Sequence, residues 1–145
     1  MCRGLLVSAL TLTAALVASP ALVASPALAA DPVQIKNVGN GNCLTVAPNS
    51  VYTLLCGAGG PANQQWTVEN GQIKNVGNGN CLTVAPNSVY TLLCGAGEPA
   101  NQQWTVENGQ IKNVGNGNCL TVAPNSVYTL LCGVGEPANQ QWTVA

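Results

Sequence analysis

Hydrophobic and polar residues alternate in short runs along most of this chain, in the two-residue period of half-buried β-strands. In the run Cys43–Val46, for example, Leu44 and Val46 share one face, and Cys43 and Thr45 share the other. No 11-residue window carries the apolar stripe of an amphipathic helix. The strands predicted in this part of the sequence span residues 34–38, 43–46, 51–56 and 64–68. Turns or loops are predicted between them at residues 39–42, 47–50 and 57–62, and Asn70-Gly71 predicts a hairpin turn.

A 38-residue block carries this pattern and occurs three times, at Gln34–Gly71, Gln72–Gly109 and Gln110–Ala145. Apart from their ends, the copies differ at two positions: Gly60 becomes Glu98 and Glu136, and Ala58 and Ala96 become Val134. Four short strands per copy predict about twelve strands. No copy has enough apolar residues to bury its own face, so the three must share one core. A closed three-fold barrel would also leave no exposed strand edges. We therefore expect one all-β domain over residues 31–145.

The segment before the repeats, residues 1–30, has the features of a secretory signal peptide. It has a short basic start at Met1-Cys2-Arg3, continues with an apolar run over 4–17, and ends in small residues that predict cleavage after Ala29 or Ala30. A membrane span is disfavoured because Pro20 and Pro26 interrupt the segment. Cys2 precedes the apolar run, which argues against a lipid anchor. The segment predicts a secreted, extracellular protein with no membrane attachment after cleavage.

Cysteine usage agrees with export, because six cysteines remain after the leader, two in each repeat. Three-fold repetition makes two pairings natural: within each repeat, or across repeats as in Cys56 with Cys81. The within-repeat pairing is favoured, since strands 43–46 and 51–56 are expected to be neighbours. Each such bond would close a loop of about 14 residues and contribute roughly 3 kcal/mol. The predicted disulfide cysteines are Cys43, Cys56, Cys81, Cys94, Cys119 and Cys132.

Charge is sparse in the predicted mature chain, with five carboxylates against three lysines and a net charge of −2. Nothing in it would neutralise a nucleic-acid backbone, and no basic amphipathic stretch suggests a membrane surface. The polar residues are mainly Asn, Gln, Thr and Ser, whose neutral hydrogen bonds suit uncharged polyols. With no histidine and widely spaced cysteines, we expect no metal and no other cofactor.

The segment Asn63-Gln64-Gln65-Trp66, preceded by Cys43-Leu44 and Cys56 and followed by Asn70-Gly71, resembles the ricin-B-type β-trefoil lectins. Their Gln-x-Trp hallmark occurs once per repeat, and here it falls at Gln64/Trp66, Gln102/Trp104 and Gln140/Trp142. The resemblance covers residues 33–145. It implies a β-trefoil with up to three shallow carbohydrate pockets, often directed at galactose, in a lectin or an accessory module of a secreted glycosidase or toxin.

The resemblance also suggests which residues would contact a sugar. Thr45 occupies the place of an Asp that binds two sugar hydroxyls in the family. Leu54 occupies the place of an aromatic residue that stacks on the sugar. Tyr52 lies two residues earlier on the same face and could stack on the sugar from this displaced position. Asn63 and Gln64 match the family's polar positions. The candidate carbohydrate-binding residues are Thr45, Tyr52, Leu54, Asn63, Gln64, Thr83, Tyr90, Leu92, Asn101, Gln102, Thr121, Tyr128, Leu130, Asn139 and Gln140.

Several of these residues also have a structural explanation. Trp66 and its copies are expected in the core. Gln64 is expected to satisfy buried backbone groups as well as to touch any ligand. Tyr52 suits a β-strand without any ligand, and the Asn-rich segment 37–42 is interpreted as turn chemistry.

An enzyme is disfavoured because no carboxylate recurs in all three repeats: Glu69 and Glu107 correspond to Ala145, while Glu98 and Glu136 correspond to Gly60. The leading prediction is a monomeric carbohydrate-binding module for neutral glycans, such as galactosides or polysaccharides, with three weak sites that act together. The alternative is a trefoil that binds no sugar and acts as a structural, protein-interaction or inhibitor module. Near-identical repeats also make domain-swapped oligomers a prediction.

Overall fold

The computed structural model describes residue 15, residues 30–135 and residues 137–145. The predicted leader lies outside the described residues except for positions 15 and 30, and so do Cys2 and Glu136. No helix among the described residues is long and apolar enough to cross a membrane.

Each repeat forms four short strands and one 3₁₀ turn, which gives twelve strands among the described residues. The first repeat contains β1 (Ile35–Asn37), β2 (Cys43–Val46), β3 (Val51–Leu54), η1 (Ala62–Gln64) and β4 (Trp66–Glu69). The second contains β5 (Gln72–Asn75), β6 (Cys81–Val84), β7 (Val89–Leu92), η2 (Ala100–Gln102) and β8 (Trp104–Glu107). The third contains β9 (Gln110–Asn113), β10 (Cys119–Val122), β11 (Val127–Leu130), η3 (Ala138–Gln140) and β12 (Trp142–Val144). The predicted all-β, three-fold fold is confirmed.

The strands lie where the sequence predicts them, but the third strand ends at Leu54 instead of residue 56, and the fourth begins later than predicted. The fourth strand was expected at 64–68, but the chain forms the turn η1 up to Gln64 and β4 begins at Trp66. The turn is short because Pro61 precedes it and the backbone is already extended at Gln65. The hairpin turn predicted at Asn70-Gly71 joins β4 to β5, and both residues have the positive φ that it requires, 51° and 79°.

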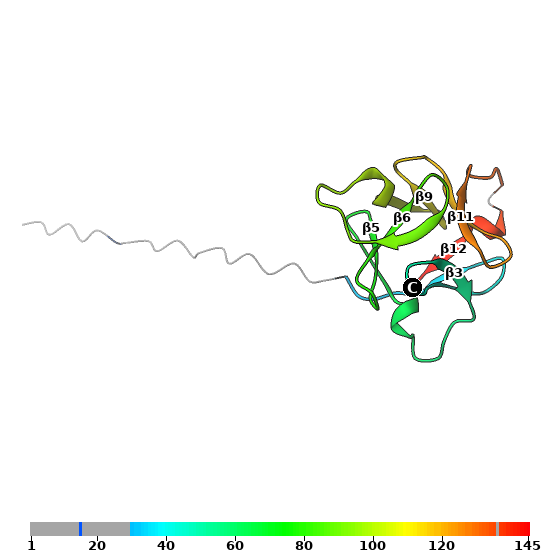
Figure 1. Cartoon of the computed structure of the whole chain (residues 1–145), viewed down its shortest axis with the longest axis horizontal. Coiled ribbons are helices and arrows are strands. Elements are labelled where there is room, and N and C mark those ends of the chain that lie inside the picture. The colour runs from blue at the N-terminus through cyan, green and yellow to red at the C-terminus, as the bar shows by residue number, and fades with distance from the viewer. Residues whose placement is uncertain (1–14, 16–29, 136) are drawn as a thin grey trace, which may run out of the picture.

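Six of the strands form a closed barrel. Antiparallel pairing joins β1 to β12, β4 to β5 and β8 to β9. Backbone hydrogen bonds from Trp66 to Val33, Trp104 to Gly71 and Trp142 to Gly109, each of 2.8–2.9 Å, connect these pairs to one another. The last strand therefore lies beside the first part of the repeat region, as Figure 1 shows for β12 and the cyan segment near it.

The remaining six strands form three hairpins, β2–β3, β6–β7 and β10–β11, which meet near the three-fold axis. Isolated bridges pair Ser50 with Tyr90, Ser88 with Tyr128, and Ser126 with Tyr52. Each hairpin is thus held by the next one around the ring, and no hairpin can move far without disturbing its neighbours.

Asparagine side chains reinforce this ring. In the contact between the first two repeats, the Asn49 backbone oxygen accepts from the Thr91 amide at 2.9 Å, and its Oδ1 accepts from Asn80 Nδ2 at 3.1 Å and from the Thr91 hydroxyl. Asn78 Nδ2 donates to the Pro48 oxygen at 3.1 Å and to the Thr91 hydroxyl. The same contacts join the second repeat to the third, and the third to the first. The Asn-rich turns therefore do more than shape the local turn, which is all that the sequence suggested.

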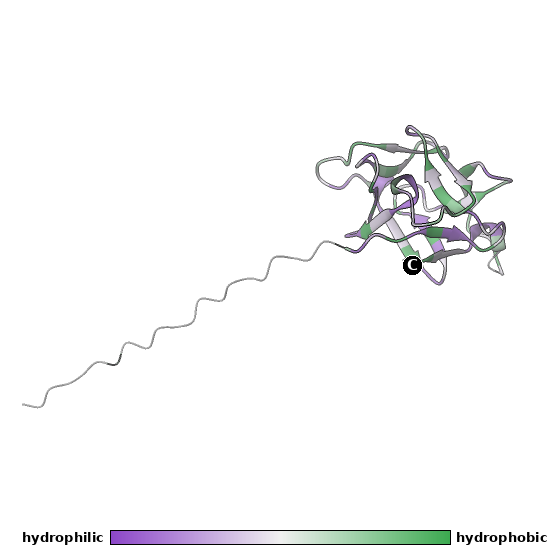
Figure 2. Ribbon diagram, turned by 90° about the horizontal axis from the view of Figure 1, so that it is seen from below, coloured by the Kyte–Doolittle hydropathy of each residue, from purple (hydrophilic) through white to green (hydrophobic). Residues whose placement is uncertain are grey.

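The three repeats contribute equally to one core. The buried apolar residues of the first repeat are Ile35, Leu44, Val46, Val51 and Trp66, and the other repeats supply their counterparts. This arrangement confirms that one repeat cannot bury its apolar face alone. Figure 2 shows that hydrophobic residues also lie on loops at the edge of the molecule, where Leu55, Leu93 and Leu131 are about four-fifths exposed.

Candidate functional site

The outward face of each hairpin carries the residues that the sequence singled out. On the first hairpin, Thr45 of β2 lies opposite Tyr52 of β3, and Cys43 lies opposite Leu54. Alternation puts these four side chains on one face of the hairpin and Leu44 and Thr53 on the other. The 3₁₀ turn η1 packs against β2 and covers part of this face. We call Tyr52, Leu54 and Asn63, with the equivalent residues of the other repeats, the hairpin faces.

The disulfides connect the two ends of each hairpin, and they confirm the within-repeat pairing. They join Cys43 to Cys56, Cys81 to Cys94 and Cys119 to Cys132, with 5.0 Å between the Cα atoms of each pair. They anchor the start of the loop that leads from each hairpin to its 3₁₀ turn.

Gln64 braces this loop from within. Its Oε1 accepts from the Gly57 amide at 2.7 Å, and its Nε2 donates to the Leu55 oxygen and to the Thr45 hydroxyl, each at 3.0 Å. The Thr45 hydroxyl in turn donates to the Cys43 oxygen at 2.8 Å. The other repeats reproduce these bonds.

This brace changes the role expected of two predicted contact residues. Thr45 and Gln64 are buried, with 1% and 4% of their surface exposed, and their hydrogen-bonding groups are engaged within the protein. The same holds for Thr83, Thr121, Gln102 and Gln140. In this conformation these side chains lie beneath the hairpin faces and are not free to meet a ligand, because the loop needs them to satisfy its own backbone.

Trp66 is also part of the protein core. It is fully buried, and its indole Nε1 donates to the Leu44 oxygen at 3.0 Å. Trp104 and Trp142 make the equivalent bonds to Leu82 and Leu120. The expectation that the three tryptophans belong to the core is confirmed.

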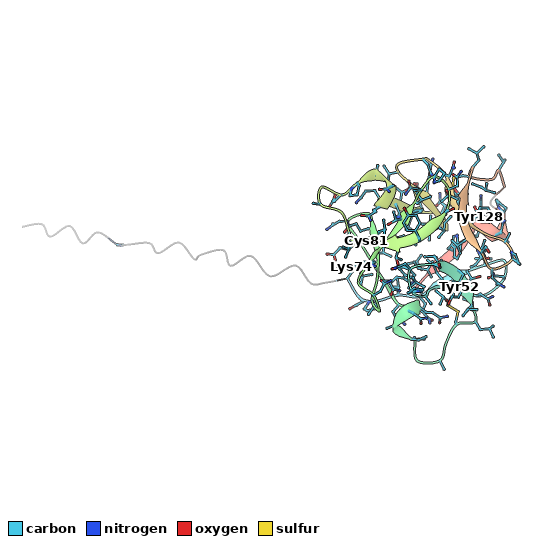
Figure 3. The ribbon with its side chains drawn as sticks, in the orientation of Figure 1. Tyr52, Lys74, Cys81 and Tyr128 are labelled. Carbon is cyan, nitrogen blue, oxygen red and sulfur yellow. A yellow bond between two sulfur atoms is a disulfide. The ribbon has the colours of Figure 1, made fainter. Side chains whose placement is uncertain are left out.

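The accessible part of each hairpin face is a small group of mixed polarity. Leu54 is 48% exposed and Tyr52 is half-buried. Asn63 is also half-buried, and only its backbone oxygen, which accepts from Asn75 Nδ2, takes part in a hydrogen bond within the described residues. Tyr90, Leu92 and Asn101, and Tyr128, Leu130 and Asn139, form the corresponding groups. Figure 3 shows Tyr52 and Tyr128 on two of the hairpins, apart from Lys74 on the barrel strand β5.

Surface hollows lie elsewhere, on the barrel hairpins where one repeat passes into the next. One, of about 180 Å³, is lined by Thr67, Glu69, Asn70, Gln72, Lys74 and Glu98. Its counterpart, of about 270 Å³, is lined by Thr105, Glu107, Asn108, Gln110 and Lys112. We call these the first and second junction hollows. The sequence pattern did not indicate these hollows, although the repeat places equivalent residues at both junctions.

Within the part of the chain that the structure describes, no group of three or more His, Cys, Asp or Glu side chains is arranged to hold a metal ion.

Comparisons with known proteins agree with the fold. The family model of the ricin-type β-trefoil lectin domain matches residues 31–142. A search of curated proteins gave no match.

Among solved structures, a cytolethal distending toxin from Actinobacillus actinomycetemcomitans aligns with a TM-score of 0.66 and 22% identity, over 79% of this chain and 90% of that one. The C-terminal half of an earthworm R-type lectin, solved in complex with GalNAc, aligns with a TM-score of 0.64 and 16% identity, over 78% of this chain and 96% of that one. The agglutinin from Abrus precatorius gives a TM-score of 0.68 and 22% identity, over 80% of this chain and 47% of that one. At these identities the likeness shows a shared fold.

Proposed function

Because this chain belongs to the ricin-type β-trefoil lectin family, we propose that it binds neutral glycans through its three hairpin faces. The observation that supports this proposal is the threefold recurrence of a tyrosine and a leucine on one face of a hairpin, with an asparagine in the 3₁₀ turn that packs against the same hairpin. Such a mixture suits a sugar ring, which has one apolar face and a rim of hydroxyl groups.

The three side chains of a hairpin face would make different contacts with the sugar. The Tyr52 ring and Leu54 would lie against the apolar face of the sugar, and the Asn63 carboxamide would exchange hydrogen bonds with its hydroxyls. No carboxylate belongs to this group, so each site lacks the stronger charge-assisted bonds and should bind weakly. Three equal sites on one rigid domain compensate through avidity on a glycan that presents several copies of the sugar.

Galactosides are the first sugars to test, because the earthworm lectin with the same fold was solved with GalNAc. Polysaccharides with repeated sugar units are the second class, since they present many equivalent ligands to the three faces.

The test is a glycan array probed with the oxidised protein in multivalent form. We expect signal on a coherent set of neutral glycans, and at least a roughly tenfold loss when Tyr52, Tyr90 and Tyr128 are changed together to alanine, because aromatic anchors dominate such contacts. The matched control changes Val38, Val76 and Val114 to alanine, since these valines are also exposed and also recur three times. An array without signal on folded protein, or equal losses in both triple variants, would contradict the proposal.

A second candidate function is favoured by one observation. Leu55, next to each hairpin face, is 82% exposed, and its copies are similarly exposed. Exposed leucine pairs are typical of surfaces that contact another protein. If the array is blank while substitution of Leu55, Leu93 and Leu131 by serine improves solubility, the protein-interaction alternative is preferred.

We also propose that the protein is exported, with residues 1–30 acting as the signal peptide. Mass spectrometry of protein recovered from the culture medium should show an N-terminus at Ala30 or Asp31. Retention of the intact leader would contradict this proposal.

A further inference from the structure

The junction hollows are formed by the outward faces of two barrel hairpins. On β4 and β5, Trp66 and Ile73 point into the core, so the alternating residues Thr67, Glu69 and Lys74 point outward together with Gln72. The register places Thr67 opposite Lys74 and Glu69 opposite Gln72. Directly opposite residues have their Cβ atoms about 4.5–5.5 Å apart, so the four side chains form one compact group.

These side chains have free hydrogen-bonding capacity. No hydrogen bond among the described residues uses the side chain of Glu69, Gln72 or Lys74. Together they offer a carboxylate that accepts, an ammonium that donates and a carboxamide that does both. Charge-assisted hydrogen bonds are about twice as strong as neutral ones, so this group can hold hydroxyls more firmly than the uncharged hairpin faces.

Glu98 adds a second carboxylate to the first hollow. It lies in the loop before η2 and contributes to the lining of the first hollow. Its backbone has a φ of 53°, in the left-handed region that favours glycine, and the equivalent residue of the first repeat is Gly60, with a φ of 62°. The first hollow therefore contains two carboxylates, Glu69 and Glu98, and one lysine.

We propose that the first junction hollow is a second sugar site, selective for a sugar that carries a free amino group. The surplus carboxylate pairs with the ammonium of the ligand, while Gln72 and Lys74 bind its hydroxyls. The hollow is smaller than the roughly 300–1,000 Å³ of pockets for drug-sized ligands, which suits a single sugar ring. This inference rests on the proposed function for its ligand class, but it concerns different residues and a different face of the domain.

The experiment is an NMR titration of the oxidised, ¹⁵N-labelled protein with glucosamine, glucose, N-acetylglucosamine and ammonium chloride, at a pH where the amine is protonated. Glucosamine should shift the backbone amides of Gln72, Lys74 and Glu98 saturably, and at lower concentration than the two neutral sugars. Equal binding of glucose, absence of shifts at these amides, or the same shifts with ammonium chloride would overturn the proposal.

Two variants sharpen the test. Glu98→Gly should weaken glucosamine binding roughly two- to fivefold, the range expected for one exposed ion pair, and Gly60 shows that the backbone accepts glycine at this position. Glu69→Gln keeps the size of the side chain and should weaken binding at least as much. An unchanged affinity in both variants would overturn the assignment.

A third variant separates this site from the proposed function. The triple change of Tyr52, Tyr90 and Tyr128 to alanine should abolish binding at the hairpin faces and leave the glucosamine shifts at Gln72 and Lys74 in place. Loss of the shifts at Gln72 and Lys74 in this folded triple variant would overturn the junction site.

Discussion

The hairpin faces and the junction hollows come from the same repeats, yet they differ in charge and in number. Residues 43–55 and their copies at 81–93 and 119–131 contain no charged residue and are identical in the three repeats. The two junction hollows contain carboxylates and lysines, and the residue of the third repeat that corresponds to Glu69 and Glu107 is Ala145. The hairpins are suited to three equal weak sites, and the two junction hollows to charge-assisted hydrogen bonds.

The same comparison separates residues that hold the fold from residues that face solvent. Each hairpin face rests on a buried hydrogen-bond network, in which Gln64 donates to the Thr45 hydroxyl. The side chains of the junction hollows protrude from strands whose other residues fill the core. Substitutions at Glu69 or Lys74 can therefore change binding with little effect on stability, whereas substitutions beneath a hairpin face should change stability first.

The largest expected effect in this comparison is that of Gln64→Ala. It would leave the Gly57 amide, the Leu55 oxygen and the Thr45 hydroxyl without their partner, so we expect the free energy of unfolding to fall by about 1–3 kcal/mol. Urea denaturation of the oxidised protein measures this loss.

Two controls are matched to Gln64→Ala. Asn63→Ala changes the neighbouring amide, whose side chain makes no hydrogen bond among the described residues, and Glu69→Gln changes an exposed residue of the first junction hollow. Each should alter stability by less than about 0.5 kcal/mol. If Asn63→Ala destabilised the domain as much as Gln64→Ala, the brace would not be the feature that holds the loop.

The sequence pattern was sufficient to predict the fold because the same strand and turn signals recur in each of the three repeats. The alternation in Cys43–Val46 and the Asn70-Gly71 turn are local signals, and both predicted the observed strands and hairpin. The disulfide pairing followed from the same strand assignment. What local signals missed was the 3₁₀ turn at Ala62–Gln64, because three residues show no helical period.

The candidate site was less predictable because its features depend on contacts between distant residues. The bond between Gln64 and Thr45 spans 19 positions, and nothing in either segment alone indicates that each satisfies the other. The contact of Asn80 with Asn49 crosses from one repeat to the next, so a local interpretation of the Asn-rich turns could not find it. The junction hollows likewise combine residues of two repeats, so the pattern within a single repeat does not predict them.

The difference between Gly60 and Glu98 can be traced to the packing of the glutamine that precedes each tryptophan. A Cβ at Gly60 would meet the Gln65 carboxamide, so in the first repeat this side chain occupies the space above the loop. In the second repeat the equivalent Gln103 lies instead against Gly71, where a Cβ would meet its carboxamide oxygen. The first repeat has Val33 at the position of Gly71, so it carries a Cβ where one would meet the glutamine carboxamide in the second repeat.

The smallest predicted effect is an energetic coupling between Gly60 and Val33 through the Gln65 side chain. Gly60→Glu should destabilise the domain by about 1 kcal/mol, since it introduces a side chain at positive φ and displaces Gln65. Val33→Gly opens the alternative position for Gln65, so the two changes together should be less harmful than the sum of the single changes, with a coupling of at least about 0.5 kcal/mol. A double-mutant cycle followed by urea denaturation measures the coupling. Additive effects would mean that Gln65 does not link the two positions, and that the exchange of Gly60 for Glu98 is independent of the residue before each repeat.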